Sequence, residues 1–110
     1  MSQYLLLLYH DPAGMRQLSP EEMQAITEKY MAWGKKPFVK GSQRLGPDAG
    51  KIVRAASPPR VSDGPYAESK EVLGGYYIIE AANYEQAVER SMDHPHLTHG
   101  TMVIREFWQQ

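Results

Sequence analysis

Residues 63–79 read DGPYAESKEVLGGYYII, and this stretch runs from a turn through a charged segment and a glycine pair into an aromatic strand. Asp63, Gly64 and Pro65 suit a tight turn, because aspartate bonds nearby backbone, glycine accepts a positive φ and proline fixes the exit. Residues 75–81 (GYYIIEA) carry the aromatic and β-branched side chains that strands favour. We predict a strand here, and the glycine pair allows a bulge or a close backbone approach where it begins.

The clearest helix start lies at residues 18–23 (LSPEEM). Ser19 can cap the first amides, Pro20 suits the first helical position, and Glu22 completes a capping box. The apolar stripe that follows at helical spacing predicts a face directed toward a core, and it consists of Met23, Ile26, Tyr30 and Trp33. A second helix is predicted after Asn83, with an apolar face made of Tyr84, Ala87, Val88 and Met92.

The remaining strands complete a β-α-β-β-α-β order. The apolar run QYLLLLY at residues 3–9 predicts a central strand, residues 51–54 and 60–62 predict an irregular hairpin, and residues 101–108 predict a last strand. This order is that of the α+β, ferredoxin-like split βαβ arrangement. Such a sheet has helices on one face, so we predict that a second copy of the chain covers the other face.

Composition limits the classes of protein to consider. The 110 residues fit one domain, residues 1–110. With 12 Lys and Arg against 13 Asp and Glu the formal net charge is −1, which does not favour nucleic acid as a partner. The chain has no Cys, which favours a reducing, cytoplasmic location. The apolar run at residues 5–8 is too short to span a membrane, so no membrane partner is predicted.

The stretch at residues 63–79 closely resembles the signature of the YCII-related family, in the branch named for its DGPF motif. Tyr66 replaces the Phe of that motif, and the residues that match it are Asp63, Gly64, Pro65, Ala67, Glu68, Lys70, Glu71, Leu73, Gly74 and Gly75. YLLLLY, GSQRLGP, the HP pair before the last strand and VIRE also follow in family order, so the resemblance covers nearly the whole chain. It implies a dimeric α+β barrel, in which two ferredoxin-like sheets pack face to face.

The resemblance also suggests where chemistry would occur. The family is largely uncharacterised, and activity is suspected from a His on the first helix and an Asp before the last strand. Tyr30 aligns near that His and His94 aligns at that Asp, so neither residue type is kept. We predict His94, Asp63 and Tyr30 as catalytic residues. For each of them a structural role, in a loop, a turn or the core, stays open.

Substrate contacts are predicted at Tyr66 and Arg105. Arg105 can neutralise a substrate carboxylate, although an ion pair with a neighbouring strand is the alternative. His94, His96 and His99 stand close enough in sequence for an open zinc site. Pro95 prevents a regular helix there and no acidic partner is evident, so we predict no metal and no cofactor. If His94 titrates normally, ligand binding would change across about pH 5.5–7.5.

Two functions remain open. The first is a homodimer that binds a small polar or aromatic metabolite between sheet and helix, with isomerase or lyase-type proton transfer. Lactone isomerases and a dehydrochlorinase of similar fold suggest this chemistry by analogy only. The second is a non-catalytic ligand-binding or regulatory module, because DGPF relatives are often associated with extracytoplasmic-function sigma factors.

Overall fold

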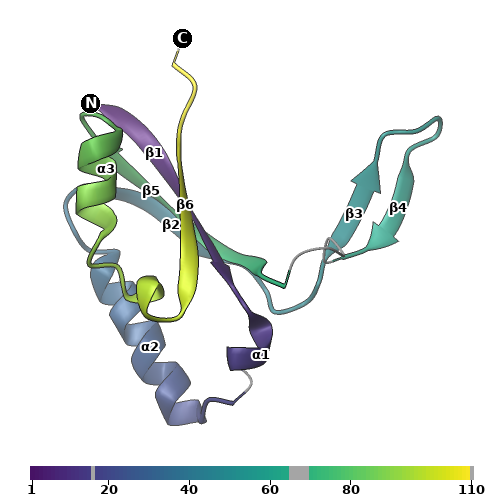
Figure 1. The fold of residues 1–110 in the computed structure, drawn as a ribbon, viewed down its shortest axis with the longest axis horizontal. Coiled ribbons are helices and arrows are strands. Elements are labelled where there is room, and N and C mark those ends of the chain that lie inside the picture. The colour runs from purple at the N-terminus through teal and green to yellow at the C-terminus, as the bar shows by residue number, and fades with distance from the viewer. Residues whose placement is uncertain (16, 65–69, 110) are drawn as a thin grey trace.

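The computed structural model describes residues 1–15, 17–64 and 70–109. Its main sheet has four antiparallel strands in the order β2-β5-β1-β6 (Figure 1). The strands are β1 (Ser2–His10), β2 (Val39–Arg44), β5 (Val72–Ala81) and β6 (Gly100–Glu106). Counted along the chain, the first and third of these strands lie at the centre and the second and fourth at the edges. This is the split βαβ order, and the α+β prediction is confirmed.

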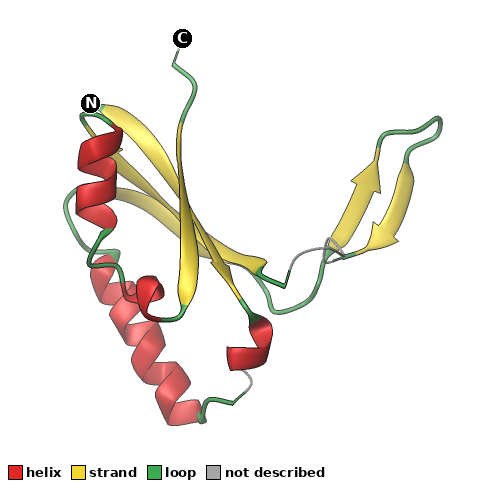
Figure 2. Ribbon diagram, in the orientation of Figure 1, coloured by secondary structure: helices red, strands yellow, loops and turns green. Residues whose placement is uncertain are grey.

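The helices lie on one side of this sheet (Figure 2). They are α1 (Pro12–Met15), α2 (Pro20–Trp33) and α3 (Tyr84–Ser91), followed by a short 3₁₀ helix, η1 (Pro95–Thr98). The core between helices and sheet consists of Tyr4, Leu6, Leu8, Trp33, Tyr77, Ile79, Ala81 and Ala87. Within the described ranges, none of the helices has the length and apolar character that crossing a membrane requires.

The opposite face of the sheet is apolar and lacks a helical cover in the part of the chain that the structure describes (Figure 2). Side chains alternate along a strand, so Leu5, Leu7, Tyr76 and Ile78 point away from the core. All four are half-buried, and Val103 of β6 is 39% exposed. We call these five residues the open face.

The second strand of the sheet was not predicted from the sequence. Residues 39–44 (VKGSQR) form β2, although their composition is polar and they show no clear alternation of apolar side chains. This strand lies at an edge of the sheet and pairs only with β5, so its outer side reaches water. An edge strand needs few apolar residues, which explains why the pattern did not reveal it.

The predicted hairpin is confirmed, but it stands apart from the main sheet (Figure 1). It consists of β3 (Lys51–Arg54) and β4 (Arg60–Asp63), which form a separate two-stranded sheet. Val53 and Val61 face each other across it, and each is 65% exposed. We call this segment the arm.

The predicted apolar face of the second helix is largely wrong. Ala87 is buried as expected, but Tyr84, Val88 and Met92 are 47%, 45% and 68% exposed. Ser91 is buried in their place and donates a hydrogen bond to the Ala87 carbonyl at 2.7 Å. The small side chains of Ala87 and Ser91 let the helix approach the sheet closely, so the stripe of larger side chains turns outward.

The glycine pair behaves as predicted. The pairing of β1 with β5 shifts register between Leu8 and Tyr9, where Leu8 pairs with Gly75 and Tyr9 with Leu73, which leaves Gly74 as the extra residue of a bulge. A Cβ on Gly75 would stand 2.8 Å from the Gln43 carbonyl oxygen, so the backbones of β2 and β5 approach closely here.

The start of α2 is the predicted capping box. Ser19 Oγ accepts from the Glu22 amide at 3.1 Å, and Glu22 Oε1 accepts from the Ser19 amide at 3.1 Å. Replacing Ser19 with Ala is expected to cost about 1 kcal/mol of the free energy of unfolding, because one helix amide loses its acceptor. Urea unfolding measures this, with Ser57→Ala in the arm as a control. Equal stability of the two variants would contradict the role of the cap.

Gly64 corrects one detail of the predicted turn. It does not adopt a positive φ, and among the described residues only Gly50 does, at 71°. A Cβ on Gly64 would instead stand 2.2 Å from the Ala49 carbonyl oxygen. The requirement for glycine therefore comes from close backbone approach at the base of the arm.

Replacing Gly64 with Val should displace the base of the arm, since the backbone must move to admit a side chain, and overpacking of this kind costs about 1–3 kcal/mol. Gly14→Ala is the matched control, because a Cβ at Gly14 meets nothing within 4 Å. Thermal unfolding monitored by circular dichroism compares the two. A melting temperature for Gly64→Val as high as that of Gly14→Ala would contradict the close approach.

Candidate functional site

A tyrosine and two histidines meet at one end of the sheet. The Tyr30 hydroxyl, from α2, lies 2.6 Å from His96 Nδ1 and 3.0 Å from His99 Nε2. His96 lies on η1 and His99 directly follows it, where the chain enters β6. η1 packs against both α2 and β6, and its position brings together residues that are 66 and 69 positions apart in sequence.

The hydrogen bonds define where the protons lie. His96 Nε2 is 2.7 Å from the Tyr9 carbonyl oxygen, and a carbonyl only accepts, so this nitrogen carries the proton. Nδ1 of a neutral His96 therefore accepts from the Tyr30 hydroxyl. The Tyr30 oxygen then accepts from His99 Nε2–H. The result is a chain of donors running from His99 through Tyr30 and His96 to the backbone of β1.

Burial keeps these three hydrogen-bonded side chains uncharged. It raises the pKa of Tyr30 well above its ordinary value, and Arg44 opposes that rise only in part. Burial also lowers the pKa of His96 and of His99, and His10 lowers both further through its charge. His96 is 3% exposed, whereas His99 is exposed to solvent. His99 is thus the member of the chain that a small molecule can reach.

His94 lies beside Tyr30 and His96 but is enclosed by aromatic rings. It is 2% exposed, and its ring centroid lies 4.4 Å from that of Trp33, 4.7 Å from Tyr77 and 5.3 Å from Tyr30. Its Nδ1 accepts from the His96 amide at 3.0 Å, so its proton is on Nε2. Nε2 is buried and has no hydrogen-bond partner among the described residues.

The expected pH dependence of ligand binding through His94 is wrong, because of where His94 lies. Burial, together with the charge of His96 and against the opposing charge of Asp93, lowers the pKa of His94 to about 4. His94 is therefore neutral across the range of about pH 5.5–7.5 in which we expected it to titrate. Its acceptor nitrogen caps the start of η1, which places His96 against Tyr30.

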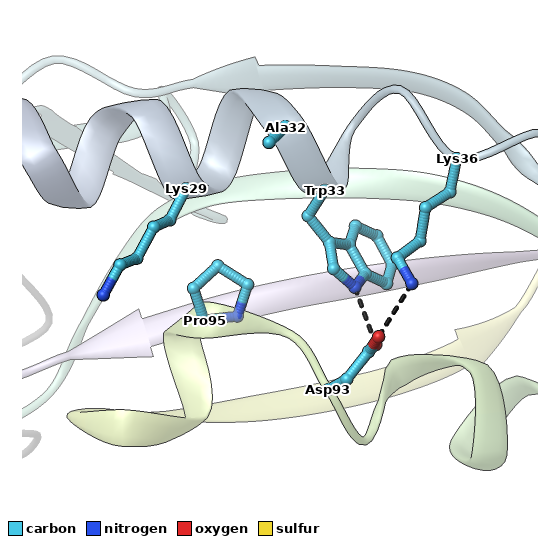
Figure 3. A pocket seen from close by; sticks show the side chains of 6 residues that line it. All are labelled: Lys29, Ala32, Trp33, Lys36, Asp93 and Pro95. Atoms are coloured by element: carbon cyan, nitrogen blue, oxygen red, sulfur yellow. Dashed lines mark hydrogen bonds and ion pairs between the residues drawn. The ribbon is translucent and has the colours of Figure 1, made fainter.

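A shallow surface pocket of about 350 Å³ lies between α2 and the segment that leads into η1 (Figure 3). Its lining consists of Lys29, Ala32, Trp33, Lys36, Asp93 and Pro95. Asp93 accepts from Trp33 Nε1 at 2.9 Å and from Lys36 Nζ at 2.7 Å, and these two bonds lower its pKa. The charges of Lys36 and Asp93 are thereby paired with each other, and Lys29 is the third charged residue of the lining.

The other predicted site residues lie elsewhere. Asp63 ends β4 in the arm, where its carboxylate is 80% exposed and forms an ion pair with Lys51. Tyr66 lies outside the described residues. Arg105 pairs with Leu5 in the register of β6 with β1 and points to the same side as the open face. Of the predicted residues, the structure thus brings together Tyr30 and His94 and leaves Asp63 and Arg105 apart from them.

His96 and His99 were not predicted as partners of Tyr30. They were considered, with His94, for a zinc site, and among the described residues no group of three or more ligands is placed to hold a metal ion. The signal that could have found them is the Pro95 turn, because a one-turn helix after it repeats side chains at a spacing of three. His96 and His99 have that spacing, so they share one side of η1.

These features define a class: an α+β domain with a tyrosine–histidine site at one end of its antiparallel sheet. The YCII-related domain family matches residues 2–109. An uncharacterised protein of Rhizobium meliloti (strain 1021) is 33% identical over 99 aligned residues, which cover 82% of this chain and 77% of that protein. The chain belongs to the YCII-related family.

Proposed function

We propose that the protein is a homodimer that binds a small polar or aromatic metabolite beside Tyr30 and His99 and transfers a proton to or from it. The DGPF motif and the dimeric α+β barrel are part of this proposal. The open face supports the dimer, because a contiguous apolar surface of this kind is usually covered by a partner. The placement of Tyr30 between two imidazoles carries the chemical part of the proposal.

In this mechanism His99 is the catalytic base. Its Nε2–H is held by Tyr30, so Nδ1 is the nitrogen that takes a proton from a substrate carbon next to a carbonyl. The electron pair of the broken C–H bond remains on the substrate as an enolate. The imidazolium then returns the proton to a second carbon, which completes an isomerisation. Tyr30 is a positioning residue. Its raised pKa keeps the hydroxyl protonated, so the hydroxyl donates to His96 while its oxygen accepts from His99 Nε2–H.

Deuterium exchange tests this proposal. A panel of small ketones and keto acids with acidic C–H bonds is incubated with the protein in D₂O, and incorporation is read by mass spectrometry. His99→Gln should slow exchange roughly 100-fold or more, as expected for loss of a general base. Tyr30→Phe should slow it less and should move the pH profile, because His99 loses its fixed acceptor. Lys29→Gln, at the neighbouring pocket, is the control.

A regulatory module without catalysis is the second candidate. It is favoured by the hydrogen bonds of the site, because Tyr30 and both nitrogens of His96 already have partners within the chain. A module associated with an extracytoplasmic-function sigma factor would bind its ligand at the same place and leave it unchanged. Binding of a panel compound that moves the His99 resonances without any deuterium incorporation would support this candidate and contradict the catalytic one.

A further inference from the structure

Two more basic side chains lie at the same end of the sheet as Tyr30 and His99. In the pairing of β2 with β5, Arg44 lies opposite Gly75, and Ser42 lies opposite Tyr77. The Tyr77 hydroxyl donates to the Tyr30 carbonyl at 2.9 Å. Alternation along β2 places Arg44 on the same side of the sheet as Ser42, which is the side of the helices. Arg44 is close enough to Tyr30 to affect its ionisation.

His10 is the second of these basic groups. It ends β1 opposite Gly100 of β6. Its ring packs against Gly74, since a Cβ on Gly74 would stand 2.6 Å from His10 Cε1. Its charge acts on both His96 and His99. Arg44 on β2 therefore acts on Tyr30 of α2, and His10 on β1 acts on its two partners, His96 and His99.

The described carboxylates near these groups have partners of their own. Asp11, next to His10, accepts from the Ala13 amide at 2.9 Å, and Asp93 accepts from Trp33 and Lys36. Glu71 accepts from Thr101 Oγ1 at 3.0 Å. Met102 packs against the core, and the side chain of its neighbour Thr101 points to the opposite face of the sheet. Glu71 therefore lies toward that opposite face. Among the described residues, no carboxylate shifts the pKa of Tyr30, His96 or His99.

We propose that the ligand of this site is a small carboxylate, held by Arg44 and by the protonated form of His99, so that binding takes up a proton. This inference rests on the second candidate under Proposed function, the ligand-binding module, whose site it shares, because a His99 that is protonated against a carboxylate is not available as the base. The Arg44 guanidinium can hold a carboxylate with two parallel hydrogen bonds. His99 Nε2 is taken by Tyr30, so the ligand meets Nδ1, which donates only when the ring is protonated. Here the Nδ1 contact with Thr98 Oγ1, at 3.1 Å, gives way to the ligand.

Proton uptake makes the affinity depend on pH. A bound carboxylate raises the pKa of His99, so the affinity should rise as the pH falls from about 8 to about 5.5. Tyr30 and His96 stay neutral in this range, because burial raises the pKa of the first and lowers that of the second.

Benzoate and its neutral analogue benzamide provide the test. Each is titrated into the full-length protein while the imidazole Cε1–H resonances are followed by NMR. Benzoate should move the His99 signal, raise its titration midpoint and bind more tightly at low pH, whereas benzamide should bind at least about tenfold more weakly. Arg44→Gln should weaken benzoate binding about tenfold, which corresponds to loss of a charge-assisted contact. Arg60→Gln, in the arm, is the matched control and should bind benzoate as the wild type does.

Equal binding of benzamide and benzoate, or equal affinity in Arg44→Gln and Arg60→Gln, would overturn the proposal. The same conclusion would follow if benzoate, acetate and succinate all failed to move the His99 signal. Failure of this inference is distinguishable from failure of the proposed function. If benzamide binds and Tyr30→Phe or His99→Gln weakens it, the site stands and only the requirement for an anion is wrong.

Discussion

Replacing Leu7 with Glu is expected to turn the proposed homodimer into a folded monomer. Leu7 lies at the centre of the open face, between Tyr76 of β5 and Val103 of β6. A two-fold interface on this face would bury the new carboxylate twice, and an unpaired buried charge is costly. We expect the dimer to dissociate roughly 100-fold or more readily. Light scattering at micromolar concentration measures this, and circular dichroism checks that the monomer is folded.

Val88→Glu is the matched control for this experiment. Val88 is 45% exposed on α3, on the helical side of the molecule, so the same chemical change there should leave the dimer intact. Val103→Glu tests the open face at a more exposed position, and this substitution should also dissociate the dimer. A wild-type monomer at micromolar concentration, or a Leu7→Glu variant that remains dimeric, would contradict the interface.

The second large effect is expected on stability below neutral pH. His94 is buried and its pKa is lowered to about 4, whereas in the unfolded chain it is 6.5. Between these values the unfolded state binds the extra proton, so stability is fully present above about pH 6.5 and is lost as the pH falls toward 4. The loss attributable to His94 is about 3 kcal/mol.

His94→Gln isolates this contribution. The amide oxygen of glutamine can still accept a hydrogen bond at the start of η1, but the side chain does not titrate. Urea unfolding of wild type and variant between about pH 7 and pH 4 should therefore show two curves that converge as the pH falls. Other titrating groups are common to both proteins and cancel in the difference. Parallel curves would mean that His94 is not buried as a neutral group.

The elements that were predictable from sequence are those with strong local signals. Ser19 and Glu22 fix the start of α2 through hydrogen bonds within one turn, and the apolar run of β1 needs burial on both faces wherever it lies. Strand β2 has neither kind of signal, since an edge strand is held by its partner β5 and by water. Gly64 shows the same limit, because the carbonyl that it must approach belongs to Ala49, on the other side of the arm.

The candidate site was predictable only in part. Tyr30 was predicted because it aligns near the histidine on the first helix of the family that the chain resembles. Its partners, His96 and His99, lie beyond four strands and a helix, and no local pattern indicates a contact over that separation. His94 was recognised, but its role was reversed. The sequence suggested a titrating group, and burial among Trp33, Tyr77 and Tyr30 makes it a neutral cap for η1.

The arm has a consequence for how the chain can be divided. Its tip, residues 55–59, joins β3 to β4 far from the core, and exposed tips are where chains are most readily cut. A cut there separates a fragment carrying β1, α2 and β2 from one carrying β5, α3 and β6. In the sheet these strands interleave, because β5 of the second fragment pairs on one side with β1 and on the other with β2 of the first. The two halves are thus complementary by topology, and the arm is the natural place to split this protein into fragments that reassemble.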